Sequence, residues 1–163
     1  MIHLSRSDIV DFQGDAIVNA ANPTLLGGGG VDGAIHRAAG RELYEECKLL
    51  GGCQPGDAKV SKGYRLKARY VIHTVGPVWK GGGHDEAEIL ASAYRRCLEL
   101  ALEMNLSSIA FPNISTGVYG FPKPLAAQIA VATVKEILES HPELEVHFIC
   151  FDIENYREYE RLL

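Results

Sequence analysis

Apolar residues follow two different spacings along the chain, and each spacing predicts one kind of secondary structure. Short apolar runs bounded by polar or glycine-containing segments are typical of β-strands. Longer segments repeat apolar residues every three or four positions, which is typical of helices with one buried face. The predicted strands are Ile2–Leu4, Ala16–Asn19, Ala58–Ser61, Tyr70–Val75, Ser108–Phe111 and Val146–Phe151. The predicted helices are Gly33–Leu49, Glu86–Met104, Leu125–Ser140 and Glu154–Leu163.

The order of these elements predicts the fold class. Strands that alternate with long helices form an α/β fold, in which helices cover a central sheet. Pro122 and Pro124 mark the start of the third helix, because proline is tolerated in the first turn of a helix. No repeat, linker or low-complexity tract divides the chain, and 163 residues is a usual length for one domain. We therefore expect residues 1–163 to form a single domain.

Composition and charge narrow the classes of function. The chain is 47% hydrophobic and 23% charged, and 16 basic against 21 acidic residues give a net charge of −5. This balance argues against disorder and against a surface that coats nucleic acid. No apolar run approaches the roughly 18 residues that cross a bilayer, and no signal region is visible, so we expect a cytoplasmic protein without a membrane partner. No Cys-x-x-Cys pair occurs, so we expect reduced, buried thiols at Cys47, Cys53, Cys97 and Cys150.

Two glycine-containing loops each connect a predicted strand to a predicted helix. The first contains Gly27–Gly30, and the second runs over Phe111–Pro122. Consecutive glycines let the backbone approach a ligand closely, and a helix N-terminus offers unpaired N–H groups with a partial positive charge. Neither loop carries the Gly-Lys-Ser/Thr of a P-loop or the spaced glycines of a dinucleotide fold. The loops therefore predict a diphosphate held in a crevice at the carboxyl ends of the strands.

Several motifs, in order and with consistent spacing, resemble one known family over nearly the full chain. They are Asp8–Ile9, Val18–Asn22, Gly28–His36, Tyr70–Trp79 and Ile114–Pro122. Together they resemble the macrodomains of the MacroD type. The resemblance implies a three-layer α/β/α fold with a central mixed sheet and a cleft for ADP-ribose. It also implies hydrolysis of ester-linked ADP-ribose, from O-acetyl-ADP-ribose or from mono-ADP-ribosylated acidic side chains of proteins. No spacing of His, Asp and Cys indicates a metal site, and we expect no cofactor.

The resemblance assigns catalysis to Asp32 and Asn22, which lie at the spacing that the MacroD pattern requires. Asp32 would orient or deprotonate a water that attacks the ester carbonyl or a position near the anomeric carbon. The amide of Asn22 would bind hydroxyls of the distal ribose. Taken alone, Asp32 also suits a helix N-cap, and Asn22 suits a loop-stabilising amide. A helix N-terminus favours the Asp32 carboxylate, whereas a bound diphosphate disfavours its charge.

The resemblance also assigns the residues that bind the rest of the substrate. Asp8 would accept a hydrogen bond from the adenine amino group, the Ile9 backbone would contact the ring edge, and Phe151 would stack on adenine. Tyr119 and Phe121 would wall the distal ribose. Phe151 also suits a core aromatic, Phe121 a loop anchor and Asp8 a turn or cap. Backbone groups and short side chains complete the predicted site: Ala21, Gly29, Gly30, Val31, Ser115, Thr116, Gly117 and Val118.

Four other residues in or near these motifs have interpretations of their own. His36 lies one turn after Asp32 and could pair with it, although we favour packing against the glycine loop. We interpret Asn19 as structural and His73 as a hydrogen-bonded core histidine. Asn113 departs from the family pattern, in which a small apolar residue precedes Ile-Ser-Thr-Gly, and would alter the floor of the cleft.

Two other functions would use the sequence differently. A non-catalytic ADP-ribose reader would have the same cleft, and Asp32 is the residue that favours the enzyme. An RNA-binding protein or ribonuclease would need a basic stripe or an aromatic platform, and the sequence has neither. We therefore expect ADP-ribose, its esters and mono-ADP-ribosylated proteins as partners, and neither DNA nor RNA.

Overall fold

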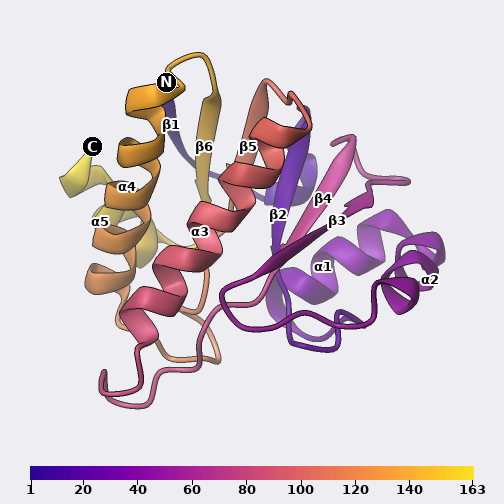
Figure 1. The fold of residues 1–163 in the computed structure, drawn as a ribbon, viewed down its shortest axis with the longest axis horizontal. Helices are drawn as coiled ribbons and strands as arrows, with labels where there is room; N and C mark the ends of the chain where they lie inside the picture. The colour runs from indigo at the N-terminus through magenta and orange to yellow at the C-terminus, as the bar shows by residue number, and fades with distance from the viewer.

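A computed structural model describes residues 1–163 and contains a six-stranded sheet between two layers of helices (Figure 1). The strands are β1 (Ile2–Arg6), β2 (Ala16–Ala20), β3 (Ala58–Lys62), β4 (Tyr70–Thr74), β5 (Ser108–Phe111) and β6 (Glu145–Cys150). The helices are α1 (Gly30–Ala39), α2 (Arg41–Leu50), α3 (Glu86–Glu103), α4 (Lys123–Ser140) and α5 (Ile153–Leu162), with a short 3-10 helix, η1, over Ile9–Asp11. None of these helices is both long and apolar enough to cross a membrane.

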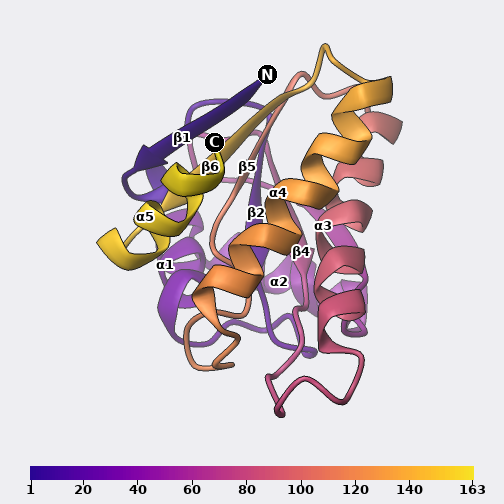
Figure 2. The ribbon, with the colours of Figure 1, turned by 90° about the vertical axis from the view of Figure 1, so that its left-hand side faces the viewer.

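The sheet is mixed, and its strands lie in the order β1-β6-β5-β2-β4-β3. All neighbouring strands are parallel except β3, which is antiparallel to β4. Helices α1 and α2 cover one face, whereas α3, α4 and α5 cover the other (Figure 2). The predicted three layers and mixed sheet are therefore confirmed. All six predicted strands are present, with small shifts at their ends.

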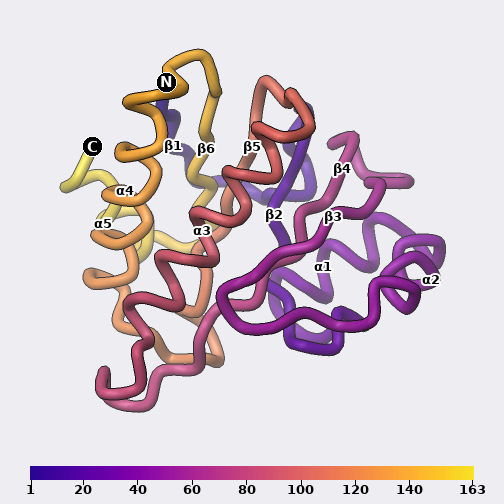
Figure 3. Tube along the Cα trace, viewed as in Figure 1, coloured from indigo at the N-terminus to yellow at the C-terminus, as the bar shows by residue number.

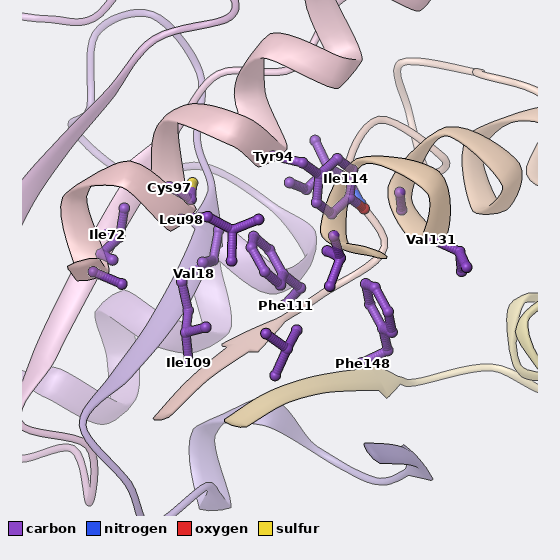
Figure 4. Packing of buried hydrophobic residues seen from close by; sticks show 14 of the residues in the cluster. Val18, Ile72, Tyr94, Cys97, Leu98, Ile109, Phe111, Ile114, Val131 and Phe148 are labelled. Carbon is purple, nitrogen blue, oxygen red and sulfur yellow. The ribbon is translucent and has the colours of Figure 1, made fainter. Parts of the chain in front are cut away.

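Successive residues of the central strands are buried on opposite faces of the sheet. In β2, Val18 packs in the cluster beneath α3 and α4, while its neighbour Ile17 packs in the cluster beneath α1 and α2. Figure 4 shows the first cluster, in which the Phe111 ring of β5 lies 5.0 Å from the Tyr94 ring of α3. Burial on both faces explains why these strands are nearly continuous apolar runs rather than alternating ones.

The predicted single helix Gly33–Leu49 is wrong, because the chain forms two helices that meet at Gly40. Helix α1 begins earlier, at Gly30, and ends at Ala39, and α2 follows directly. Gly40 has φ +90° and ψ 177°, a backbone conformation that is strained for any residue with a Cβ. Both helices bury their apolar faces in the same cluster, so the apolar spacing continues through the break. The spacing therefore contains no sign of the turn.

Replacing Gly40 with alanine is expected to lower the free energy of unfolding by about 1–3 kcal/mol, because a Cβ disfavours this φ. Urea unfolding followed by circular dichroism measures the change. Gly83→Ala is the matched control, since a Cβ there meets no neighbouring atom and the φ of Gly83 is not left-handed. Equal stability of the two variants would contradict the strain at Gly40.

The carboxylate of Glu86, at the start of α3, holds the loop that precedes the helix. It is buried and accepts hydrogen bonds from the backbone N–H groups of Lys80, Gly82 and His84. Burial favours a higher pKa for Glu86, but the hydrogen bonds outweigh burial and lower the pKa to about 2. The ionised form of Glu86 therefore stabilises the fold.

Glu86→Gln is expected to lower the melting temperature at pH 7, because one carboxamide oxygen replaces two carboxylate oxygens. The lowered pKa places this stabilisation above the ordinary value of 4.5, and it is lost as the pH falls toward about 2. The difference in melting temperature between wild type and variant should therefore shrink over that range. Calorimetry at several pH values measures it, with the exposed Glu88→Gln on the same helix as control. A difference that stays constant with pH would contradict this assignment.

Candidate functional site

A cleft of about 720 Å³ lies at the carboxyl ends of the parallel strands. It is placed where β2 and β5 are neighbours, and the loops after these strands lead to α1 and α4 on opposite faces of the sheet. Ligands of open α/β sheets bind at such positions, because the diverging loops leave a crevice. The loops after β2, β4 and β5 lie together at one end of the molecule in both ribbon views and in the chain trace of Figure 3.

Most of the residues that the sequence predicts for binding and catalysis line this cleft. Both glycine loops contribute to it, so the prediction that they face one crevice is confirmed. The predicted residues in the lining are Asp8, Ile9, Ala21, Asn22, Gly29, Gly30, Val31, Asp32, Ser115, Thr116, Gly117, Val118, Tyr119 and Phe151.

Phe121 does not line the cleft, which corrects its predicted place as a wall of the distal ribose. Its side chain is 2% exposed, and its ring packs against the Trp79 ring at 4.8 Å. Trp79 belongs to the loop after β4, and its backbone N–H donates to the Tyr119 carbonyl at 2.8 Å. Phe121 therefore anchors the second glycine loop on Trp79, and Tyr119 is the aromatic of the pair that faces the cleft.

Two runs of backbone N–H groups in the lining donate no hydrogen bond within the protein. One run covers residues 29–32 at the start of α1, and the other covers residues 116–119. The N-terminus of α1 adds a partial positive charge to the first run. Arg37 is the only cationic side chain of the lining. The cleft therefore suits an anion held mainly by main-chain donors, which an acidic protein can bind as well as a basic one.

Asp32 lies in the first turn of α1, and its carboxylate is buried beside the cleft with an exposed fraction of 4%. Its Oδ1 accepts a hydrogen bond from Asn19 Nδ2 at 2.8 Å, and His36 Nε2 lies 3.4 Å from the same oxygen. Burial raises the pKa of Asp32, and Asn19 and His36 oppose that shift only in part. The N-cap of α1 is Gly29, so Asp32 does not have the alternative role of a cap. A carboxylate with a raised pKa is a stronger base than an exposed one, which suits proton abstraction.

Asn22 stabilises its own loop and also lines the cleft. Its Nδ2 donates to the Gly27 carbonyl at 3.0 Å, and its Oδ1 accepts from the Thr24 backbone N–H at 3.1 Å, so the loop-stabilising interpretation is confirmed. A Cβ on Gly28 would lie 3.4 Å from Asn22 Nδ2 and 3.3 Å from Asp32 Oδ2. The amide and the carboxylate thus approach the same edge of the glycine run.

A further part of the cleft is formed by the start of η1 and the end of β6. Asp8 caps η1, because its Oδ1 accepts a hydrogen bond from the Val10 N–H at 3.1 Å. Phe151 follows β6 and is 79% exposed, which excludes its alternative role as a core aromatic. An exposed aromatic ring can stack on a flat heterocycle. A carboxylate with a free oxygen can accept a hydrogen bond from an amino group of that heterocycle.

A family model described as Macro domain matches residues 18–130, from β2 into α4. The chain belongs to the macrodomain family. A macro domain-containing protein of Chlorobaculum tepidum is 57% identical to this macrodomain over an alignment of 164 positions, which covers 100% of the chain and 95% of that protein. The O-acetyl-ADP-ribose deacetylase of Citrobacter rodentium is 54% identical over an alignment of 168 positions, which covers 99% of this chain and 94% of that protein. The crystal structure of the Trypanosoma brucei macrodomain in complex with ADP-ribose has a TM-score of 0.93 and 48% identity, and covers 99% of this chain and 68% of that one.

Several residues of this macrodomain's cleft were not predicted from the sequence. Ala34 and Arg37 follow Gly30 on one face of α1, and helical spacing was the only signal for them. Asn155 comes from α5, and its Nδ2 lies 3.4 Å from Thr116 Oγ1, a contact that no motif marks. The full set that was missed as binding residues is Ser7, Ala20, Gly28, Ala34, Arg37, Gly76, Pro112, Asn113, Ile114, Ile149, Asp152 and Asn155. Asn113 does reach the cleft, where its Nδ2 also donates to Cys150 Sγ at 3.4 Å.

Two histidines lie near this part of the macrodomain, His36 beside Asp32 and His73 on the far side of Asn19. The His36 ring lies 3.6 Å from where a Cβ on Gly27 would be, so the favoured interpretation of packing against the loop is confirmed. His73 is buried and hydrogen-bonded, as predicted for a core histidine. The four cysteines are buried and free, and no group of three or more His, Cys, Asp or Glu side chains is placed to hold a metal ion.

Proposed function

We propose that this macrodomain binds ADP-ribose in the cleft and hydrolyses its esters. The substrates are O-acetyl-ADP-ribose and mono-ADP-ribose attached to acidic side chains of proteins. The observation that carries the proposal is the buried Asp32 carboxylate at the edge of a cleft whose free N–H groups suit a diphosphate. A binding module needs only the N–H groups and a stacking surface. A buried base beside them favours a chemical step.

In the proposed complex, ADP-ribose lies along the cleft with its adenine toward η1 and its distal ribose toward α1. The diphosphate lies against the two runs of N–H groups, residues 29–32 and 116–119. Adenine lies on Phe151 with its amino group toward Asp8, and the distal ribose lies beside Asn22 and Tyr119. The similar Trypanosoma brucei macrodomain in complex with ADP-ribose supports this ligand, and the similar deacetylase of Citrobacter rodentium supports the reaction. The ester is then held near Asp32, at the edge that Asp32 shares with Asn22.

The reaction adds water across the ester. The Asp32 carboxylate takes one proton from a water molecule, and the water oxygen forms a bond to the ester carbonyl carbon. The bond between that carbon and the ribose oxygen breaks, the ribose oxygen takes up a proton, and the carboxylic acid leaves. When the ester oxygen is bonded to the anomeric carbon, as in mono-ADP-ribose on an acidic side chain, attack at that carbon would instead break the bond on the other side of the ester oxygen. The raised pKa of Asp32 increases its basicity in either case.

The test is release of ADP-ribose by the purified protein from O-acetyl-ADP-ribose and from a protein carrying glutamate-linked mono-ADP-ribose. Running the reaction of the glutamate-linked substrate in ¹⁸O-water locates the bond that breaks, because attack at the carbonyl labels the released carboxylate and attack at the anomeric carbon leaves it unlabelled. Release from both substrates is the expected result. If the protein binds ADP-ribose but does not release it from either ester, it is a reader. If it shows no binding and no release, the whole proposal is contradicted.

A further inference from the structure

A buried series of hydrogen bonds connects the Asp32 carboxylate of α1 to β3, an edge strand of the sheet. Asn19 of β2 donates through Nδ2 to Asp32 Oδ1 at 2.8 Å, and the same Nδ2 lies 3.1 Å from His73 Nδ1. His73 of β4 in turn has its Nε2 2.8 Å from Ser61 Oγ of β3. All four side chains are buried. This series of hydrogen bonds therefore crosses three neighbouring strands, β2, β4 and β3.

Only one placement of the protons gives each of these hydrogen bonds one donor and one acceptor. The Asn19 amide nitrogen has two hydrogens, so it donates to both Asp32 and His73, and His73 Nδ1 must accept without a proton of its own. The proton of neutral His73 is then on Nε2 and is donated to Ser61 Oγ. The Ser61 hydroxyl donates to the Lys62 carbonyl at 3.1 Å, which ends the series. Asn19 Oδ1 has no partner, so the amide is oriented by its nitrogen alone.

The groups around His73 keep it neutral. Burial lowers the pKa of His73 to about 3, and His36 of α1 adds to this shift. From α2, Cys47 Sγ lies 3.7 Å from His73 Nε2, and burial, with Glu46 and Asp32, raises the pKa of Cys47 to about 11. Neither His73 nor Cys47 changes its charge near neutral pH, so the donor and acceptor roles along the series of hydrogen bonds are fixed there.

We propose that His73 and Ser61 are positioning residues for the reaction, which hold the Asn19 amide with its nitrogen toward Asp32. Without an acceptor at His73 Nδ1, one N–H of the buried Asn19 amide has no partner. The amide then shifts toward another acceptor, and its remaining hydrogen bond no longer holds the Asp32 carboxylate in its place at the edge of the cleft. The expected change in kcat rests on the proposed hydrolysis, whereas the orientation of the Asn19 amide does not depend on it.

A matched pair of variants separates the acceptor from the bulk of the ring. His73→Asn and His73→Leu have the same branched shape and leave the same space, but only asparagine has an oxygen near the former Nδ1. His73→Leu is expected to lower kcat on the order of 100-fold, with little change in KM, because the base is misplaced while the N–H groups that bind the diphosphate are not. His73→Asn is expected to recover on the order of tenfold of that loss. Equal kcat for the two variants would overturn the proposal.

The tautomer of His73 tests the proposal without any activity. Nitrogen-15 NMR of the wild-type protein is expected to show a neutral His73 that is protonated at Nε2 and unprotonated at Nδ1. A proton on Nδ1 would overturn the proposal, even if His73→Leu failed to fold. If the wild-type protein hydrolyses neither ester, the proposed function fails, and carbon-13 NMR of the Asp32 carboxyl then serves as the readout. Its titration should move in His73→Leu and return toward wild type in His73→Asn, and an unmoved titration in both would overturn the positioning role.

Discussion

Replacing Asp32 with asparagine is expected to lower the turnover of O-acetyl-ADP-ribose by about 10²–10⁴-fold, which is the usual contribution of a positioned general base. The affinity for ADP-ribose should change little, because the lost group acts mainly in the transition state. Asp32→Ala should give the same loss of turnover. Release kinetics and titration calorimetry with ADP-ribose measure the two quantities. Turnover that survives both substitutions would transfer the role of base to another group, such as the phosphate of the substrate.

The stability of the Asp32 variants should separate their loss of function from unfolding. A raised pKa means that the folded protein disfavours the Asp32 charge, so this group lowers stability as the pH rises through its raised pKa. Asparagine can still accept the hydrogen bond from Asn19 and carries no charge. Asp32→Asn should therefore melt at or above the wild-type temperature at pH 7. The exposed Asp11→Asn is the control, and a marked fall in the melting temperature of Asp32→Asn alone would contradict this account.

The raised pKa of Asp32 also predicts the pH dependence of hydrolysis. A base acts when it is unprotonated, so the rate should fall as the pH decreases through the pKa of Asp32. Burial moves this fall to a higher pH than an ordinary aspartate would give. The dependence of kcat on pH measures it.

Replacing Gly33 with alanine should also have a large effect, and it should act on binding rather than on turnover. The added Cβ would lie 2.4 Å from the Gly28 carbonyl oxygen and 3.0 Å from Arg37 Nη1. The first contact is with backbone, so the glycine loop must move away from α1. Overpacking of this kind costs about 1–3 kcal/mol. Because the displaced loop carries the N–H groups of the cleft, this cost would weaken ADP-ribose binding by about fivefold to 150-fold.

The expected loss of binding in Gly33→Ala is opposite to the effect of helix propensity, so propensity alone would not produce it. Alanine in a helix is otherwise favoured over glycine by about 1 kcal/mol, so a merely helical Gly33 would be stabilised by the change. Titration calorimetry with ADP-ribose gives the affinity, and Gly83→Ala, which meets no neighbouring atom, is again the control. Wild-type affinity in Gly33→Ala would show that the loop does not depend on its contact with α1.

The sequence was sufficient for the strands and for the layers, but not for the break at Gly40. Strands β2, β4 and β5 are buried on both faces, so their apolar runs are unmistakable. At Gly40 the chain turns without leaving the cluster that both helices cover, and the apolar spacing is unbroken. A glycine within a helical pattern is a weak signal, because glycine is tolerated there at a modest cost.

The site was predictable where it lies on motifs and not where it depends on packing. The glycine loops, Asp32 and Asn22 lie in continuous segments whose order in the chain resembles the family. Arg37 and Asn155 reach the cleft because α1 and α5 pack where they do, and neither has a motif of its own. Phe121 shows the opposite case, since it lies inside a motif but contacts Trp79 instead of the cleft. Membership of a motif therefore does not decide which way a side chain points.

The free N–H groups of residues 116–119 have a consequence for how such a protein can evolve. Main-chain donors do not depend on the identity of the side chains they carry, so substitutions in this loop can leave the anion cradle intact. Val118 is fully exposed at the rim of the cleft and does not pack in the core. The side chains of this loop can therefore change in evolution while its main-chain N–H groups still face the cleft.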